Sequence, residues 1–182
     1  MRFNDEYYLK AWKENNEYPK IHRKLFELIK ERVTGDSFID VCGCHGLLGQ
    51  HLLELGSAVM CDADTKTIKM GKDYGLTLKQ YEIKITENTY PEFSQILTTN
   101  SVNVLVARRC FSEIFAPIPK DHWPTFAQLI KDAGVKEVFL QGRAVYKNHT
   151  HPLYSVVQEI EVIDSQYEVQ YQEGQHAYLT LK

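Results

Sequence analysis

Short apolar runs alternate with longer amphipathic segments along most of the chain. The apolar runs are too short for typical helices and contain few polar residues, which is typical of strands buried on both faces of a sheet. These runs comprise residues 38–42, 58–61, 102–106 and 138–140, with a weaker run over 78–85 in which lysines and glutamates alternate. In the amphipathic segments, apolar residues recur at the spacing of a helix face. The predicted helices span residues 18–33, 48–55, 65–73, 123–133 and 153–160.

The tail of the chain follows a different pattern. Residues 167–171 and 177–181 alternate around Glu173-Gly174, as expected of an antiparallel hairpin. Five strands separated by helices predict an α/β fold with a Rossmann-like, doubly wound and mostly parallel seven-stranded sheet that ends in a C-terminal antiparallel hairpin. No repeat, low-complexity tract or linker divides the sequence. We therefore expect a single domain over residues 1–182, with 1–33 as an N-terminal helical segment.

Composition narrows the class of protein further. The 182 residues are 43% apolar and 25% charged, as in ordinary globular proteins, and a net charge of −3 gives no electrostatic reason to wrap a nucleic-acid backbone. A membrane span needs about 20 consecutive apolar residues, and no stretch of the sequence approaches this length. The first residues are polar and lack the apolar region of a secretory signal peptide. The four cysteines are expected to be reduced thiols. We therefore expect a cytoplasmic protein without membrane association.

The turn after the first strand carries the candidate chemistry. It reads FIDVCGCHGLLGQHL over residues 38–52. In doubly wound sheets, ligands bind beyond the carboxyl ends of the strands. An acidic residue, Asp40, followed by small residues and a helix start gives a ligand access to the backbone and to free N–H groups. The second strand ends in Met60-Cys61-Asp62, where a carboxylate can accept both hydroxyls of a ribose.

This combination resembles the class I S-adenosylmethionine-dependent methyltransferases. When their first motif, D-x-G-x-G-x-G, is overlaid on the turn, Asp40 takes the acidic position and Gly46 the third glycine, while Cys42 and Cys44 occupy the first two glycine positions. An alternative register makes Gly43 and Gly46 the working glycines. Cysteine is penalised at any positive φ that glycine adopts freely. The resemblance covers most of the chain from about Tyr18 onward.

The resemblance implies S-adenosylmethionine as the cofactor. Asp62 would hold its ribose, Ala63 and Asp64 would flank the adenine, and residues 85–87 would contact the adenine amino group. Arg108 and Arg109 would bind the substrate, because they follow the fourth strand, where the family places its substrate-facing loop. The implied cofactor-binding residues are Asp40, Cys42, Gly43, Cys44, His45, Gly46, Asp62, Ala63 and Thr86.

The implied function is transfer of a methyl group to an unidentified acceptor. Near-neutral charge and the absence of a recognition domain favour a small molecule or a protein over nucleic acid as the acceptor. Two alternatives stay open: a catalytically inactive binding or regulatory subunit, which the cysteines in the glycine turn favour, and an enzyme that degrades the cofactor. An intact dinucleotide motif G-x-G-x-x-G is absent, which argues against NAD.

Simpler structural roles are available for several of these residues. Asp62 could cap the helix over 65–73, and Asp40 could cap the backbone of the turn. Arg109 could pair with Glu113, which lies four residues later. Glu113 is also a candidate general base, as are the two histidines at 149 and 151.

Two further groups of residues are open to a second interpretation. Cys42, Cys44, His45 and Cys61 are enough ligands for a tetrahedral zinc ion, but Cys42 and Cys44 are closer in sequence than the usual ligand pair, so we predict no metal. The leading segment holds aromatic residues that could form a lid over a substrate or pack against the edge of the sheet. They are Tyr7, Tyr8, Trp12 and Tyr18.

Overall fold

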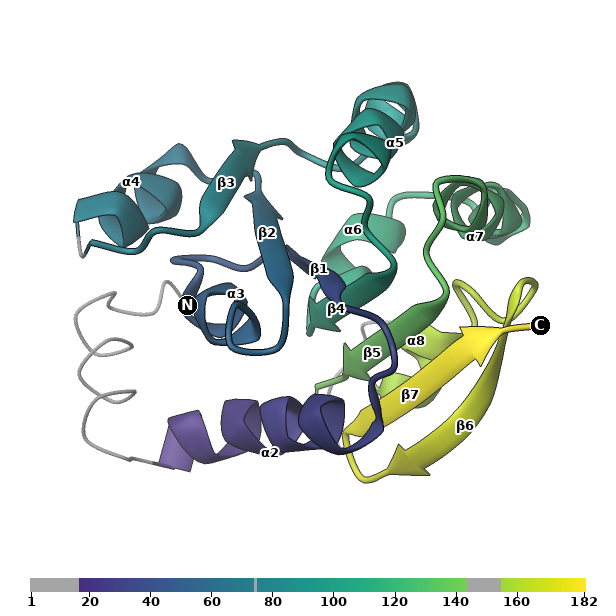
Figure 1. The fold of residues 1–182 in the computed structure, drawn as a ribbon. Coiled ribbons are helices and arrows are strands. Elements are labelled where there is room, and N and C mark those ends of the chain that lie inside the picture. Colours follow the sequence, from purple (N-terminus) through teal and green to yellow (C-terminus); the bar gives the residue numbers. More distant parts are fainter. Residues whose placement is uncertain (1–16, 74, 144–154) are drawn as a thin grey trace.

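A seven-stranded sheet forms the centre of the molecule (Figure 1). The computed structural model describes residues 17–73, 75–143 and 155–182. The strand order is β3-β2-β1-β4-β5-β7-β6, and β7 runs antiparallel to both β5 and β6 while the other pairs are parallel. The predicted fold class is therefore confirmed. The strands are β1 Ser37–Val41, β2 Ser57–Asp62, β3 Lys79–Glu82, β4 Val104–Arg108, β5 Glu137–Gln141, β6 Tyr167–Glu173 and β7 His176–Leu181.

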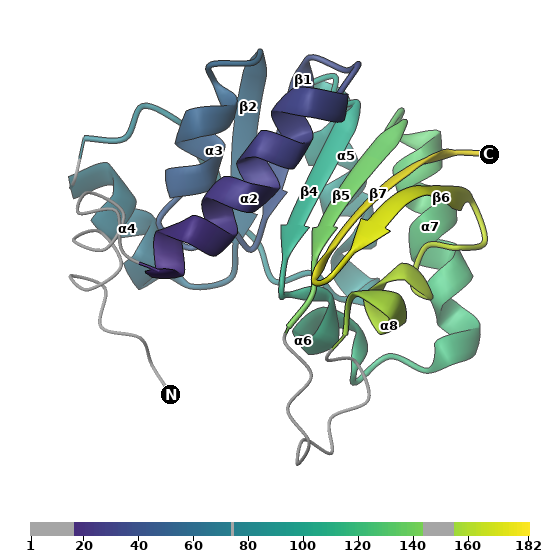
Figure 2. The same cartoon turned by 90° about the horizontal axis from the view of Figure 1, so that it is seen from below.

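Helices cover both faces of the sheet. Figures 1 and 2 show α2 and α3 on one face and α5 and α7 on the other. This arrangement is the doubly wound architecture that alternating strands and helices produce. The helices are α2 Glu17–Arg32, α3 Leu47–Leu52, α4 Thr65–Asp73, α5 Tyr90–Thr99, α6 Phe111–Phe115, α7 Trp123–Asp132 and α8 Val156–Ile160, with short 3₁₀ helices η1 Glu87–Thr89 and η2 Lys120–His122.

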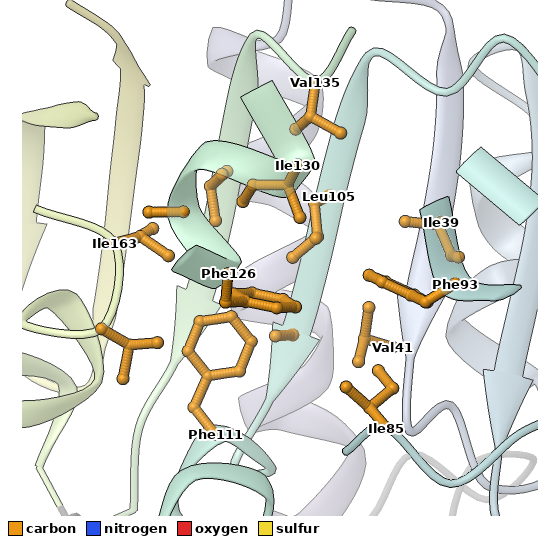
Figure 3. Packing of buried hydrophobic residues seen from close by; sticks show 14 of the residues in the cluster. Ile39, Val41, Ile85, Phe93, Leu105, Phe111, Phe126, Ile130, Val135 and Ile163 are labelled. Carbon is orange, nitrogen blue, oxygen red and sulfur yellow. The ribbon is translucent and has the colours of Figure 1, made fainter. Parts of the chain in front are cut away.

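Each face of the sheet has its own buried apolar cluster. On the face of α5 and α7, strand residues such as Leu105 pack against aromatic helix residues (Figure 3). The rings of Phe93 and Phe111 both lie 6.0 Å from the ring of Phe126, measured between centroids. The second cluster joins α2 and α3 to the opposite face of the sheet. Because successive strand residues point to opposite faces, the apolar runs supply both clusters at once.

A buried carboxylate fixes the connection between α2 and β1. Glu137 of β5 is 4% exposed. Its oxygens accept hydrogen bonds from the backbone N–H of Thr34 at 3.1 Å and of Gly35 at 2.6 Å, and from the Tyr178 hydroxyl at 2.9 Å. The amino end of the sheet is therefore tied to the end of α2 by charge-assisted hydrogen bonds.

The elements differ most from the sequence predictions at β3, α5 and α6. β3 ends at Glu82, although the apolar pattern continues to Ile85, because the chain leaves the sheet and buries Ile83 and Ile85 in the apolar cluster instead. The helices α5 and α6 were not predicted. The domain extent of 1–182 and the N-terminal segment 1–33 stay predictions. Within the described ranges, no helix has the length and apolar character needed to cross a membrane.

Candidate functional site

The ends of the central parallel strands bring the predicted site residues together. β1 lies between β2 and β4, so the strand order reverses at β1: β2 and β3 follow toward one edge of the sheet, and β4 and β5 toward the other. Open α/β sheets bind ligands at such a switch point, at the carboxyl ends of the strands. The residues at this edge are the turn after β1, Asp62 at the end of β2 and Arg108 at the end of β4.

The turn after β1 has an unusual backbone. Cys42 and Cys44 each have a φ of 53°, and Gly46 has a φ of 83°. A glycine adopts this left-handed conformation freely, whereas another residue pays about 1–2 kcal/mol. The three alternate positions match those of the three glycines in D-x-G-x-G-x-G when Asp40 takes the acidic position. The backbone therefore favours this register over the one in which Gly43 and Gly46 are the working glycines.

Close packing holds the turn against its neighbours. The Gly43 N–H donates to the carbonyl of Cys61 at 3.2 Å, and a Cβ on Gly43 would lie 2.8 Å from Oδ2 of Asp40. A Cβ on Gly46 would lie 2.8 Å from Sδ of Met60. No side chain fits at either position without displacing these atoms. Both glycines are therefore required for the packing of the turn, independently of any ligand.

Asp62 is held in one orientation by backbone hydrogen bonds. Its Oδ2 accepts from the N–H of Cys44 at 2.9 Å and its Oδ1 from the N–H of Asp64 at 2.8 Å. An ionised carboxylate accepts about four hydrogen bonds, so each oxygen keeps capacity for another donor. The alternative in which Asp62 caps α4 is wrong, because Oδ1 of Asp64 accepts from the N–H of Lys66 at 2.9 Å and performs that role.

Asp40 is a buried acid beside the partly buried guanidinium of Arg108. It is fully buried, and its Oδ2 accepts from the N–H of Gly49 at 3.2 Å and lies 3.6 Å from Nη2 of Arg108. Burial raises the pKa of Asp40 above its ordinary value, while the Arg108 guanidinium acts in the opposite direction. Nη2 of Arg108 also donates to the carbonyl of Gly43 at 3.3 Å. Among the described residues, Oδ1 of Asp40 has no hydrogen-bond partner, so it can accept from a donor at this edge.

Several solved structures with this arrangement of strands and helices are SAM-dependent methyltransferases. A SAM-dependent methyltransferase from Aquifex aeolicus is 16% identical, with both chains covered completely and a TM-score of 0.63. A TehB-like SAM-dependent methyltransferase from Corynebacterium glutamicum is 14% identical over 98% of each chain, with a TM-score of 0.59. The fold is that of SAM-dependent methyltransferases. The sequence matches no protein-family model and no curated protein.

A larger protein contains the same methyltransferase fold beside another activity. The bifunctional kinase-methyltransferase WbdD is 12% identical, with a TM-score of 0.63. The alignment covers the whole of this chain but 42% of WbdD. The shared unit is therefore the fold described above, and the remaining part of WbdD has no counterpart in this sequence.

Three cysteines around the turn, Cys44, Cys61 and Cys110, have raised pKa values and are protonated thiols at neutral pH. Burial raises the pKa of Cys44 to about 12 and places the pKa of Cys61 well above its ordinary value. Cys110, which follows β4, has a raised pKa because the thiol of Cys42 lies within hydrogen-bonding distance and because it is buried. Among the described residues, no group of three or more His, Cys, Asp or Glu side chains is arranged to hold a metal ion.

The methyltransferase fold places the other predicted cofactor-binding residues around the same edge. Ala63 is exposed directly after Asp62, and His45 is buried within the turn, 3% exposed. Thr86 begins η1 after β3, and its N–H donates to the hydroxyl of Thr89 at 2.9 Å. Since Thr86 takes part in a local capping arrangement, its backbone is fixed before any ligand binds.

The predicted pairing of Arg109 with Glu113 is wrong. Glu113 forms its ion pair with Arg143, which follows β5. Arg109 instead donates from Nη2 to Oε1 of Gln175, in the turn between β6 and β7, at 3.3 Å. The physical reason is the backbone of Arg109: its φ of 56° turns the chain sharply after β4, so Arg109 and Glu113 do not share the face of one regular helix.

The structure also reveals a buried polar residue that sequence reasoning missed. Gln141, the last residue of β5, is fully buried, and neither its Oε1 nor its Nε2 has a hydrogen-bond partner within residues 17–73, 75–143 and 155–182. It lies opposite Arg108 of β4 and His176 of β7 in the sheet register. Sequence reasoning missed Gln141 because the predicted strand ended at Leu140 and no motif surrounds this residue.

Several candidates lie outside the described residues. They are Tyr7, Tyr8, Trp12, His149 and His151. Tyr18 belongs to α2, but its side chain is likewise not described. The lid and the histidine base therefore stay predictions.

Proposed function

We propose that the protein transfers a methyl group from S-adenosylmethionine to an acceptor. The observation that carries the proposal is the turn after β1, whose left-handed residues alternate at Cys42, Cys44 and Gly46 and bring the N–H of Cys44 to Asp62. Strained backbone persists where the surrounding structure enforces it, and it clusters at functional sites. Two of these three residues bear the strain although a glycine would relieve it.

The residues at this edge fit the proposed cofactor. Asp62, already oriented by two backbone donors, has the remaining acceptor capacity that two ribose hydroxyls require. The buried Oδ1 of Asp40 lacks a donor that a cofactor ammonium group, directly or through a water, would supply. Ala63 would flank the adenine, and the backbone of Thr86 would contact its amino group. Gly43 and His45 would shape the turn itself.

The mechanism that follows is catalysis by positioning. When bound, the cofactor supplies an activated methyl group on a sulfonium ion. The chain then has to align the acceptor nucleophile behind that methyl group and exclude water. Arg108 and Arg109 would hold an anionic part of the acceptor, since both lie at the end of β4. This requirement for alignment explains why no acid–base pair stands out in the described part of the chain.

We propose a small molecule or a protein as the acceptor, in preference to nucleic acid. The net charge of −3 supports this choice, because nucleic-acid binding depends on neutralising phosphates. All four cysteines are free thiols in the structure. This supports a reducing compartment, and we propose the cytoplasm as the site of action.

Titration calorimetry with S-adenosylmethionine and S-adenosylhomocysteine tests the proposal. We expect micromolar binding to the wild-type protein and no binding of NAD. Asp62→Ala should bind the cofactor at least about tenfold more weakly, because it loses a pair of charge-assisted hydrogen bonds to the ribose. Asp62→Asn keeps the shape of the side chain and should also bind weakly. Asp132→Ala, an exposed carboxylate on α7, is the matched control and should bind like the wild type.

Three results would contradict parts of the proposal. Equal affinity of the wild type and both Asp62 variants would remove Asp62 from the site. Absence of binding would instead favour an inactive scaffold, for which the strained cysteines at two glycine positions are the supporting observation. Release of a cofactor fragment without an acceptor would identify a degrading enzyme.

A further inference from the structure

A row of polar side chains crosses the carboxyl end of the sheet beyond the proposed cofactor site. Arg108 of β4 is the register partner of Gln141 of β5, and Gln141 is the partner of His176 of β7. Residues paired across neighbouring strands point to the same face of a sheet. The three side chains therefore stand side by side. Gln141 is fully buried and His176 is 5% exposed, so the row lies inside the protein.

Gln141 has an amide that the described protein does not satisfy. A glutamine amide offers two donor hydrogens on Nε2 and an acceptor on Oε1. Both atoms are buried and without a partner. Buried polar groups are almost always hydrogen-bonded, because an unpaired one forfeits its interaction with water. This amide lies at the edge where ligands bind. A ligand that satisfies it would need an acceptor for Nε2 and a donor for Oε1.

Arg109 supplies a cation close to the end of β5. Its N–H donates to the carbonyl of Gln141 at 2.6 Å, and its Nη2 reaches Oε1 of Gln175, the neighbour of His176. Its Nε is buried and has no acceptor in the described part of the protein. Arg108 has Asp40 beside it, whereas no carboxylate lies within ion-pairing distance of Arg109 in the part of the chain that the structure describes. The charge at this position is therefore uncompensated.

We propose that Arg109 and Gln141 bind an acceptor that carries a carboxylate next to a hydroxyl or N–H group. The carboxylate would accept from Nε of Arg109 and Nε2 of Gln141, and the hydroxyl or N–H would donate to Oε1 of Gln141. A carboxylate alone, or a fully ionised phosphate monoester, only accepts and would leave Oε1 unpaired. The assignment of this molecule as the methyl acceptor rests on the proposed function above.

The backbone of Arg109 supports a binding role. Its φ of 56° is one of four positive values at non-glycine residues in the described structure, and the others include Cys42 and Cys44 of the turn. Strained residues cluster at functional sites, and the fourth such residue, Ser101, is the exception that lies away from this edge. The site for the acceptor would thus be preformed in the same way as the site for the cofactor.

Three small probes test the inference directly. Lactate has the carboxylate and the hydroxyl, propanoate lacks the hydroxyl, and lactamide lacks the charge. In the presence of saturating S-adenosylhomocysteine, we expect lactate to bind about tenfold more tightly than either of the other probes, which corresponds to one satisfied hydrogen bond or charge contact. Equal binding of lactate and propanoate would overturn the role of Oε1, and equal binding of lactate and lactamide would overturn that of Arg109.

Substitution of Gln141 separates a binding role from a structural one. Gln141→Met has nearly the same length and no hydrogen-bonding amide. We expect its thermal midpoint without ligand to equal or exceed that of the wild type, because an unpaired buried amide is removed, and its preference for lactate to disappear. Gln95→Leu, an exposed glutamine on α5, should change neither. A lower midpoint for Gln141→Met would show that the amide is used within the fold, and would overturn the proposal.

The two proposals fail in different ways. S-adenosylhomocysteine binding without discrimination among the three probes would remove this site and leave the proposed function standing. Discrimination among the probes without any cofactor binding would keep the site and remove the methyl transfer. A second measurement on the wild type, the NMR shift of the Gln141 side-chain amide on adding lactate, should show a change that propanoate does not reproduce.

Discussion

At the scale of single residues, the cysteines of the turn after β1 have the most informative conformation. Cys42 and Cys44 adopt a φ of 53° that glycine takes without penalty. The sequence has cysteine at both of these positions, although it has glycine at positions 43 and 46 of the same turn. The thiol of Cys42 contacts that of Cys110, so packing against the end of β4 compensates part of the strain.

Replacing a strained cysteine by glycine should stabilise the protein. We expect Cys44→Gly to raise the free energy of unfolding by about 1 kcal/mol, because the left-handed conformation is no longer penalised. For a chain of this size that corresponds to about 2–4 °C in the thermal midpoint. Calorimetric melting measures the change.

Ser101→Gly is the matched control for this prediction. Ser101 has a φ of 51° and lies between α5 and β4, away from the site. It should gain similar stability and leave the affinity for S-adenosylhomocysteine unchanged, whereas Cys44→Gly should bind at least as well as the wild type. A lower midpoint for Cys44→Gly together with a higher one for Ser101→Gly would show that the Cys44 side chain is needed for packing.

At the scale of elements, Glu137 determines how α2 meets the sheet. It accepts hydrogen bonds from two consecutive backbone N–H groups after α2 and from Tyr178 of β7. One buried side chain therefore joins a helix end to two strands. The partners lie far apart in sequence, and no local pattern around Glu137 indicates them.

Loss of this carboxylate should be strongly destabilising. We expect Glu137→Ala to lower the free energy of unfolding by about 3 kcal/mol, since the buried Tyr178 hydroxyl and the partly buried donors of Thr34 and Gly35 lose a charged acceptor. Tyr178→Phe removes one of these hydrogen bonds and should cost about 1 kcal/mol. Urea denaturation of both variants checks the values. A loss below that of Tyr178→Phe would mean that water replaces the carboxylate at little cost.

The sequence predicted best those strands whose apolar pattern results from burial on both faces of the sheet. β1, β4 and β5 are buried on both faces, so their apolar runs are unambiguous. β3 was predicted too long, because burial of Ile83 and Ile85 continues after strand pairing ends. α5 was not predicted, although Pro91 near its start and four apolar residues at helical spacing are typical of a helix.

At the scale of the whole molecule, the topology determines how much of the candidate site the sequence could predict. Asp40 and Asp62 follow directly from the strand ends, because parallel strands finish at one edge. The contact of Arg109 with Gln175 spans 66 residues and depends on the C-terminal hairpin returning beside β5. Gln141 has no motif around it. Its importance arises from burial without a partner, which only the packed structure reveals.

One measurement tests the central claim that a cofactor binds where β1, β2 and β4 end. In ¹H–¹⁵N NMR spectra of the labelled protein, addition of S-adenosylhomocysteine should shift the backbone amides of residues 42–46 and 62–64 most, with a smaller shift at Thr86. Amides at the opposite end of the sheet, such as that of Ser101 between α5 and β4, should stay in place. Absence of shifts at millimolar ligand, or shifts confined to residues away from this edge, would contradict the account.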